Sequence, residues 1–257
     1  MALAINNHKH DALKQSNQTV YVLHTYPFKE TSLVVELFSQ QFGRIAAVAK
    51  GARRPHSAMR GMLQSFQMLS GAWSGKNELK TLHSLDWNAG LSLLKGEALM
   101  CGFYMNELLL RLLPREDAHE NLFEYYTNTI NVLSNMQALD NGAELASTLR
   151  RFELKLLQEM GYAVPLLQDE NDAEILADKT YRYEAEYGAC DLNGSKIGTQ
   201  KNGVQLSGKT MLDMARDDYA DAATQSQSKQ LMRYLLAHYL GDKPLHTRQL
   251  LIDLQGL

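Results

Sequence analysis

Short runs of β-forming residues, separated by turn residues, occupy the first third of the chain. The runs lie at 20–25, 32–38, 44–50, 63–73 and 78–85, and Pro27, Gly43 and the sequence SGKN mark turns between them. Val, Ile, Phe and Tyr favour strands, whereas Gly, Pro, Asn and Ser favour the connections. Five short strands with turns marked by glycine, in fewer than about 75 residues, predict a small β-barrel or sandwich.

The apolar period becomes helical after Gly90. Residues three or four apart are apolar, and Pro114 follows the last of them: Leu94, Ala98, Cys101, Met105, Leu108 and Leu112. This spacing predicts a buried helix that ends before the proline. Two more helices are predicted over 117–138, with Asp117 as its N-cap, and over 143–160, with Gly161 as its C-cap.

Residues 166–206 differ again, because aromatic and polar residues alternate in the sequence TYRYEAEYGACDLNG. This alternation predicts a small β-hairpin. Ser207 is expected to cap a helix over 208–216, and helices are expected over 225–240 and 247–254. The predicted fold class is α+β, with a flexible leader over 1–18, a barrel domain over 19–88, and a mainly helical domain over 89–257 that contains the hairpin.

The net charge of −3 is unevenly distributed along the chain. Residues 1–90 carry ten Lys and Arg against five Asp and Glu, whereas residues 91–257 carry 16 against 24. Seven basic residues lie within 44–80, namely Arg44, Lys50, Arg53, Arg54, Arg60, Lys76 and Lys80. This asymmetry predicts that a polyanion binds the N-terminal part of the molecule.

Arg44 and Lys50 are an even number of residues apart in one predicted strand, so both are expected on one face of it. Ile45, Ala47 and Ala49 then face the other way. Cationic side chains on one face of a five-stranded barrel, with further cations in its loops, match the way OB-folds hold single-stranded nucleic acid. A solvated surface explains the same charges equally well.

Aromatic rings that could stack on nucleic-acid bases are the second requirement of such a site. Four aromatic residues of the predicted barrel are candidates. Phe66 is expected in the core, and Phe28, in a turn that contains a proline, is the candidate most expected to be exposed. The other two are Tyr26 and Trp73.

Several motifs together resemble the RecO family of recombination mediator proteins. They are Glu30-Thr31-Ser32, Gly43-Arg44, the run from Val48 to Arg53, Gly61 before Leu63-Gln64-Ser65-Phe66, Tyr104-x-Asn106-Glu107-Leu108-Leu109, Leu149-Arg150-Arg151-Phe152-Glu153 and Gly161-Tyr162. The resemblance covers roughly residues 19–165 and returns weakly from Gly241 to Arg248. The combination is far more specific than any single motif.

The resemblance implies a non-enzymatic mediator of DNA repair and homologous recombination. Such a protein binds single- and double-stranded DNA, anneals complementary strands, and helps to load recombinase onto gaps coated by single-stranded-DNA-binding protein. It also binds the acidic C-terminal tail of that protein and works with a RecR-type partner. The residues implied to face DNA are Arg44, Lys50, Arg53, Arg54 and Arg60.

Arg150 and Arg151 lie among apolar residues of the third predicted helix. A guanidinium beside an apolar groove suits a peptide that ends in aromatic residues and a carboxylate. The resemblance to RecO proteins implies that such a tail binds the helical domain, and Arg150 is the expected anchor for it. The structural alternative is that Arg150 pairs with Glu153 or Glu107, and for Arg151 a structural and a ligand-binding role are equally favoured.

Other chemistries find little support in the sequence. G-x-S-x-G, a Walker loop and G-x-G-x-x-G are absent, so we expect no enzyme activity. Many RecO proteins carry a four-cysteine zinc module, but only Cys190 lies in that region here, so neither a metal nor a cofactor is expected. The two cysteines and the lack of a long apolar run predict a cytoplasmic, nucleoid-associated protein without a membrane partner. An OB-fold adaptor for protein partners and an RNA-binding module remain the alternatives.

Overall fold

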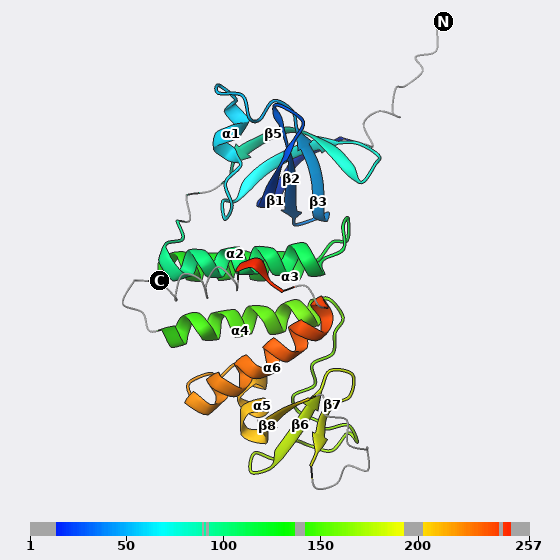
Figure 1. Ribbon diagram of the computed structural model, residues 1–257, viewed down its shortest axis with the longest axis vertical. Helices are drawn as coiled ribbons and strands as arrows, with labels where there is room; N and C mark the ends of the chain where they lie inside the picture. The colour runs from blue at the N-terminus through cyan, green and yellow to red at the C-terminus, as the bar shows by residue number, and fades with distance from the viewer. Residues whose placement is uncertain are drawn as a thin grey trace, which may run out of the picture. The chain divides into compact units, whose positions relative to one another are not determined.

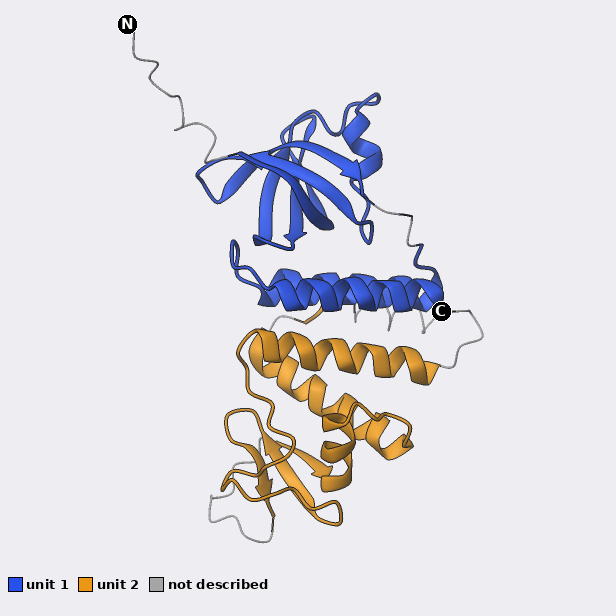
Figure 2. Cartoon of the chain, turned by 180° about the vertical axis from the view of Figure 1, so that it is seen from behind, with its two compact units in different colours: residues 1–135, 246–257 blue, residues 136–245 orange. Residues whose placement is uncertain are grey.

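The computed structural model describes residues 14–88, 90, 93–136, 142–192, 203–241 and 244–247. It divides into two compact units, which Figures 1 and 2 display. Unit 1 comprises residues 1–135 and 246–257, and unit 2 comprises residues 136–245. Most of the predicted leader and nearly all of the predicted helix over 247–254 lie outside the described residues.

Unit 1 contains a closed, OB-like barrel with the strand order β1-β2-β3-β5-β4. Neighbouring strands are antiparallel except for the parallel pair β3 and β5. A short helix connects β3 to β4. The elements are β1 (Lys14–Phe28), β2 (Ser32–Ser39), β3 (Gly43–Ala49), α1 (Ala58–Met62), β4 (Leu69–Ser74) and β5 (Leu79–Trp87).

Two strand predictions need correction. β1 begins at Lys14, six residues before the predicted start, because its first residues pair with β4. The predicted strand over 63–73 begins only at Leu69. The residues before it form α1 and a turn in which Phe66 has a φ of 69°, a left-handed conformation that strands do not adopt.

The barrel interior holds the apolar residues that alternate along the strands. Ile45, Ala47 and Ala49 of β3 lie in this core, as their period of two predicts. The main core residues from the other strands are Val20, Val22, Val35, Leu37, Leu69, Trp73, Leu82 and Leu85.

The outer side of β1 and β2 packs in part against two helices, α2 (Gly96–Leu112) and α3 (Glu120–Asn135). The ring of Tyr21 lies 5.0 Å from that of Tyr126, and the ring of Phe38 lies 5.2 Å from that of Phe123. Asn106 on α2 donates to the carbonyl oxygen of Leu23 at 3.0 Å. Burial on both sides explains the continuous apolar run Val20–Leu23 in β1 and the mostly apolar sequence of β2.

α3 begins at Glu120, so Asp117 is not its N-cap. The Asp117 carboxylate instead lies 3.5 Å from His119 Nε2. The compact unit extends beyond the predicted barrel domain over 19–88, because α2 and α3 complete a second apolar layer on the barrel.

Unit 2 combines three helices with a three-stranded sheet of order β7-β6-β8. The predicted hairpin is present as β6 and β7, and the third strand leads directly into a helix. The elements are α4 (Gly142–Glu159), β6 (Thr180–Glu184), β7 (Gly188–Asp191), β8 (Val204–Ser207), α5 (Gly208–Ala215) and α6 (Ala222–Leu240).

The helix ends in unit 2 follow the predicted signals. Gly161 has a φ of 78°, and the amides of Gly161 and Tyr162 close the end of α4 by bonding to the carbonyls of Gln158 and Leu157. Ser207 caps α5, since its hydroxyl accepts from the Thr210 amide at 3.1 Å. Helix α6 begins after Asp221, three residues earlier than predicted.

Candidate nucleic-acid interface

Arg44 lies in β3 at the end of the barrel that meets the C-terminus of α2. Its Nε donates to the carboxylate of Glu36 at 3.1 Å, and its Nη1 donates to the carbonyl oxygens of Leu110 and of Leu113, the latter at 3.0 Å. These carbonyls end α2 and have no partner within the helix. Arg44 therefore caps α2 from the barrel, and the expectation that its side chain faces DNA does not fit its position.

The buried carboxylate of Glu36 is held by a second arginine as well. Arg115 Nη2 lies 2.5 Å from Glu36 Oε1, and its Nη1 pairs with Glu78. Burial alone would lower the pKa of Arg115, but its hydrogen bonds to the two carboxylates raise the pKa above its ordinary value. We call Glu36, Arg44 and Arg115 the barrel–helix joint.

Lys80 is largely buried as well. Its side chain is 8% exposed, and its Nζ lies 2.8 Å from a carboxylate oxygen of Glu116. The Glu116 amide in turn donates to the carbonyl oxygen of Arg44 at 2.9 Å. The charge pattern predicts that Arg44 and Lys80 bind nucleic acid, but both instead hold the segment after α2 against the barrel.

The opposite end of the barrel gathers exposed cations from two connections. Lys50 follows β3 directly, and the register of β2 with β3 pairs Ala49 with Leu33, beside the β1–β2 turn. Arg53 ties the two connections together, because its amide donates to the Thr31 carbonyl at 2.9 Å and its Nη1 to the Glu30 carbonyl at 3.2 Å. Arg54 follows Arg53 and is exposed.

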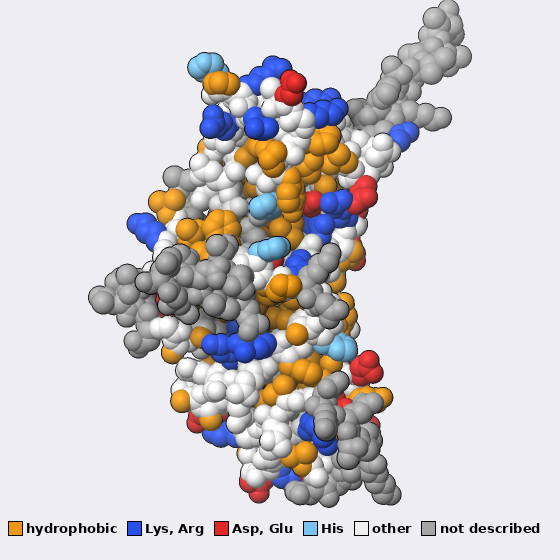
Figure 3. Space-filling model, in the orientation of Figure 1, with side chains coloured by type: hydrophobic (Ala, Val, Ile, Leu, Met, Phe, Trp, Pro, Cys, Tyr) orange, Lys and Arg blue, Asp and Glu red, His pale blue; other side chains and the backbone are white. Residues whose placement is uncertain are grey.

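Lys29 belongs to the same group, although the sequence pattern did not indicate it. It lies in the β1–β2 turn with a φ of 52°, and its Nζ stands 5.4 Å from the centre of the Phe28 ring. The period of two applies to residues within strands, so it gave no information on Lys29 in a turn. The turn between two clearly predicted strands was the signal from which Lys29 could have been found. We call Lys29, Lys50, Arg53 and Arg54 the basic end of the barrel, and Figure 3 shows Lys and Arg side chains around this end.

The basic end and the barrel–helix joint lie at opposite ends of β3. Arg44 and Lys50 are six positions apart along the chain, which is roughly 20 Å at the usual rise per residue of a strand. Lys76 is exposed in the β4–β5 turn, and the parallel register of β3 with β5 puts that turn at the joint end. Arg60 is exposed on α1. The structure thus brings together only part of the predicted cationic set.

An open patch of barrel surface adjoins the basic end. Register places Tyr26, Val34 and Val48 side by side across β1, β2 and β3, on the outward side of the sheet. Tyr26 is 44% exposed, and the two valines are partly exposed. Burial and the nearby Glu36 carboxylate raise the pKa of Tyr26, so its hydroxyl stays protonated at neutral pH. We call these three residues the open face.

The four aromatic candidates for base stacking divide into two buried and two accessible side chains. Phe66 and Trp73 are buried, at 4% and 2% exposure, so they belong to the core. Tyr26 is exposed and Phe28 is partly exposed, and both lie beside the basic end. An aromatic ring with accessible surface next to cations offers bases a place to stack.

In unit 2, Arg150 pairs with Glu153. Arg150 Nη2 lies 2.7 Å from Glu153 Oε1, one turn further along α4, and the Arg150 side chain is 13% exposed. The sequence left this pairing open as the structural alternative. The other alternative, Glu107, has different partners, because its carboxylate accepts from the amides of His246 and Thr247 at 2.7 and 2.9 Å.

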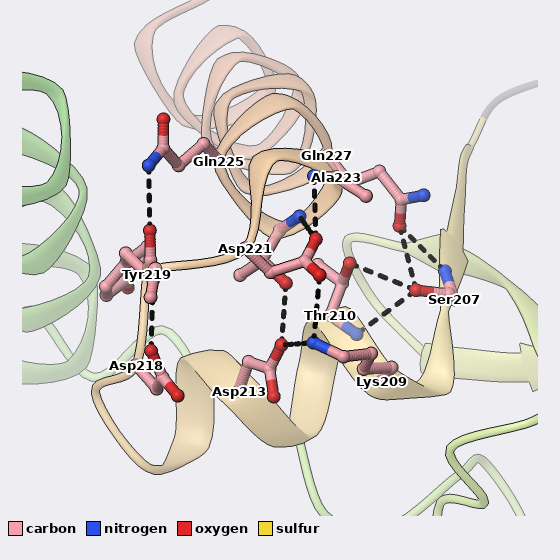
Figure 4. Close-up of polar contacts among 12 residues, drawn as sticks. Ser207, Lys209, Thr210, Asp213, Asp218, Tyr219, Asp221, Ala223, Gln225 and Gln227 are labelled. Carbon is pink, nitrogen blue, oxygen red and sulfur yellow. Dashed lines mark hydrogen bonds and ion pairs between the residues drawn. The ribbon is translucent and has the colours of Figure 1, made fainter. Parts of the chain in front are cut away.

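Arg151 is the more accessible of the two arginines. Its side chain is 32% exposed, its Nε lies 2.7 Å from the Asp217 carboxylate, and its guanidinium lies 5.2 Å from the centre of the Tyr219 ring. Asp217 and Tyr219 lie in the connection between α5 and α6. Figure 4 shows the polar contacts that order this region, including those of Asp213 and Asp221 with Lys209.

The sheet of unit 2 is held by side chains. The hydroxyl of Tyr234 on α6 accepts from the Ala185 amide at 3.3 Å, and the hydroxyl of Tyr239 donates to the Ala185 carbonyl at 3.4 Å.

Within the described parts of the chain, no group of three or more His, Cys, Asp or Glu is arranged to hold a metal. Cys190 is buried in β7, and burial raises the pKa of its thiol to about 12.

Comparison with known proteins agrees with this architecture. The fold defines the class of this protein, in which an OB-like barrel with a basic end is followed by helices and a small three-stranded sheet. The family model for "Recombination protein O N terminal" matches residues 13–90, and that for "Recombination protein O C terminal" matches residues 93–249. The chain therefore belongs to the RecO family, as the resemblance of its motifs indicated.

Named relatives cover almost the whole chain. The DNA repair protein RecO of Nitrosospira multiformis is 50% identical over 248 residues, which are 96% of this chain and 99% of the relative. The DNA repair protein RecO of Dechloromonas aromatica is 48% identical over 244 residues, which are 95% of this chain and 98% of the relative. Among the helices of the described residues, none has the length and apolar character to cross a bilayer.

Proposed function

We propose that this chain acts in DNA repair and recombination as a non-enzymatic mediator that binds single- and double-stranded DNA. The observation that carries the proposal is the basic end of the barrel beside the open face. Membership of the RecO family supports the biological role.

The cations and the aromatic side chains contribute to DNA binding in different ways. Lys29, Lys50, Arg53 and Arg54 neutralise phosphates, which releases condensed counterions and makes affinity fall steeply with salt. Tyr26 and Phe28 stack on bases, a contact worth about 1–3 kcal/mol for each base and largely independent of sequence. Single strands expose their bases and gain both contributions, whereas a duplex gains chiefly the first.

Strand annealing follows from the same surface. Two DNA strands repel each other, and a cationic platform lowers that repulsion when both strands bind near it. We further propose that the protein loads recombinase onto gaps coated by single-stranded-DNA-binding protein, together with a RecR-type partner. These steps rest on family membership, and a fluorescence annealing assay with and without the coating protein tests them.

For the acidic partner tail, we propose Arg151 as the main contact. It exposes more of its guanidinium than Arg150, and the Tyr219 ring beside it offers an apolar surface to an aromatic residue. A tail carboxylate would replace Asp217 as its partner. Arg151→Ala should therefore weaken the binding of a labelled peptide ending in Asp-Phe, while Lys155→Ala on the same helix serves as the control.

The decisive experiment measures single-strand affinity by fluorescence anisotropy across a salt series. The double variant Lys50→Glu with Arg54→Glu should lose at least about tenfold in affinity, and its salt slope should fall by roughly 1.4, which corresponds to two phosphate contacts. The matched control is Lys76→Glu, which changes charge at the joint end of the same barrel and should retain most of the affinity.

Unchanged affinity in the double variant would refute the assignment of the basic end. The double variant reverses two charges and Lys76→Glu reverses one, so an equal loss of binding free energy for each reversed charge would show a general charge effect rather than a site. Competition between DNA and RNA of the same sequence tests the RNA-binding alternative. Tail binding without measurable DNA binding would favour the protein adaptor.

A further inference from the structure

A cleft of about 480 Å³ lies in unit 2 between the sheet and the first turns of α6. It is lined by β6, β8 and α6, with amide and hydroxyl side chains at Thr180, Gln205, Ser226, Gln227 and Gln230. This volume falls within the range of about 300–1,000 Å³ that is usual for ligand sites in proteins. The cleft belongs to unit 2, whereas the proposed DNA surface belongs to unit 1.

One side of the cleft is the edge of a β-sheet. Among the described strands, the order β7-β6-β8 leaves β8 at the edge, where it pairs with β6 alone. The amide of Gly208 points back to the β6 side, where it donates to the Lys179 carbonyl at 2.8 Å. The amide of Ser207 points the other way, into the cleft, where it donates to Gln227 Oε1 at 2.8 Å.

The backbone of Gln205 also faces the cleft. Backbone groups of alternate residues in a strand point to the same side, so the amide and carbonyl of Gln205 share the direction of Ser207. Gln205 is exposed. An outward amide and carbonyl on an edge strand are the groups that an added strand uses for pairing.

Gln227 indicates what this edge accepts. Its side-chain carbonyl oxygen bonds to both the amide and the hydroxyl of Ser207, at 2.8 and 3.2 Å, as Figure 4 shows. An amide carbonyl thus already stands where the carbonyl of an incoming peptide would stand. Side chains that end in amides both donate and accept hydrogen bonds, so they complement a peptide backbone.

The lining also indicates what the cleft does not bind. None of the described residues that line it is ionisable. Phosphate groups and acidic tails depend on Lys or Arg for affinity, and these residues offer neither nucleic acid nor an acidic peptide a counter-charge.

We propose that this cleft binds a short, extended peptide segment of a partner protein, with uncharged side chains, which pairs with the edge of β8 through Gln205. Binding of this kind takes its affinity from backbone hydrogen bonds and is insensitive to salt. Gln227 competes with the peptide for the Ser207 amide, so its removal should strengthen binding.

The test uses the full-length ¹⁵N-labelled protein and a panel of blocked peptides. Each is about six residues long and alternates Thr or Gln with Val, and each is added at up to about 1 mM, which detects weak binding. A peptide that binds should shift the amide resonances of Gln205 and Ser207. The shifts should persist between about 50 and 500 mM salt, over which electrostatic binding falls steeply.

Two variants separate backbone pairing from side-chain contact. Gln205→Ala keeps the amide and should keep binding within about threefold. Gln205→Pro removes the amide, and because that amide faces away from β6 an edge strand tolerates the proline. Binding should be lost in Gln205→Pro and should tighten severalfold in Gln227→Ala.

A peptide whose central amides are N-methylated tests the same pairing without any change to the protein, and it should fail to bind. The proposal is overturned if no peptide of the panel shifts these resonances, if Gln205→Pro binds as well as Gln205→Ala, or if binding weakens steeply with salt. None of these outcomes bears on DNA binding at the barrel.

Discussion

Arg44 and Lys50 stand at the two ends of one strand, and truncating each to alanine should have opposite consequences. The Arg44 side chain is 16% exposed and joins the Glu36 carboxylate to the end of α2. Lys50 is exposed at the basic end. We expect Arg44→Ala to lower stability while leaving DNA affinity of the folded protein nearly unchanged, and Lys50→Ala to do the reverse.

The size of the Arg44→Ala effect follows from the interactions that the guanidinium makes. Removing one partner of a buried ion pair costs about 3–5 kcal/mol, because the other charge is left without compensation. In Arg44→Ala, Glu36 still pairs with Arg115, so the expected loss of stability lies at the lower end of this range. The hydrogen bonds to the α2 carbonyls, which alanine cannot make, add to the cost, although the contributions are not additive. We therefore expect the free energy of unfolding to fall by about 3 kcal/mol, whereas an exposed substitution such as Lys50→Ala stays within about 0.5 kcal/mol.

Tryptophan fluorescence is a suited assay, because both tryptophans of the chain lie in the barrel. Trp73 is buried in its core and Trp87 ends β5, so the signal reports unit 1. In urea, a decrease of about 3 kcal/mol should move the midpoint down by roughly 1–2 M. Anisotropy with a labelled single strand, below the onset of unfolding, then measures affinity.

An Arg44→Ala protein that keeps its urea midpoint and loses DNA binding would refute this reasoning. That result would mean that Arg44 reaches the nucleic acid and contributes little to the barrel–helix joint. Glu36→Gln provides a second test. It removes the buried negative charge with which Arg44 and Arg115 pair and introduces no other charge, so it should also lower the urea midpoint.

Three further predictions concern single contacts. Gly43→Ala should destabilise unit 1 by at least about 1 kcal/mol in the same urea assay, because Gly43 has a φ of 63° and an added Cβ would clash with the carbonyl oxygen of Asp117. Burial alone would raise the pKa of the Glu107 carboxyl, but its hydrogen bonds from Thr247 and His246 lower it below the ordinary value. The stability that this contact adds is therefore present above the ordinary carboxyl pKa and is lost as pH falls through the lowered pKa, and NMR titration of Glu107 should give a midpoint below that of an ordinary glutamate. Asp221→Ala should fray the start of α6, seen as roughly fivefold faster amide exchange at Ala223, because its carboxylate caps that helix.

Elements with a strong local pattern could be predicted from the sequence. The period of two placed Ile45, Ala47 and Ala49 in the barrel core, and the three- and four-residue spacing indicated the helix that ends before Pro114. Ser207 could be recognised as a cap because its partner is only three residues away. In each case the deciding interactions lie within a few residues of one another, or are shared by every residue of one face.

The contacts made by side chains on the outward side of β3 could not be predicted in the same way. Arg44 bonds to a carbonyl 66 residues further along the chain, and the position of that carbonyl depends on how α2 packs on the barrel. No local pattern encodes that distance. β4 shows the same limit, since residues 63–68 are apolar enough for the predicted strand but form an irregular segment with a turn at Phe66.

One signal for the joint was nevertheless present in the sequence. Glu36 interrupts the apolar run of β2, and a carboxylate buried there requires a cationic partner. The short connection between β2 and β3 fixes a register in which Phe38 lies opposite Arg44, so Arg44 is a diagonal neighbour of Glu36 on the same side of the sheet. A cation count over 44–80 treats all seven residues as equal, whereas this pairing rule assigns Arg44 to an ion pair with Glu36 before any nucleic acid is considered. The charge available to DNA is therefore smaller than the count suggests, and it is concentrated at the end of the barrel where Glu36 does not reach.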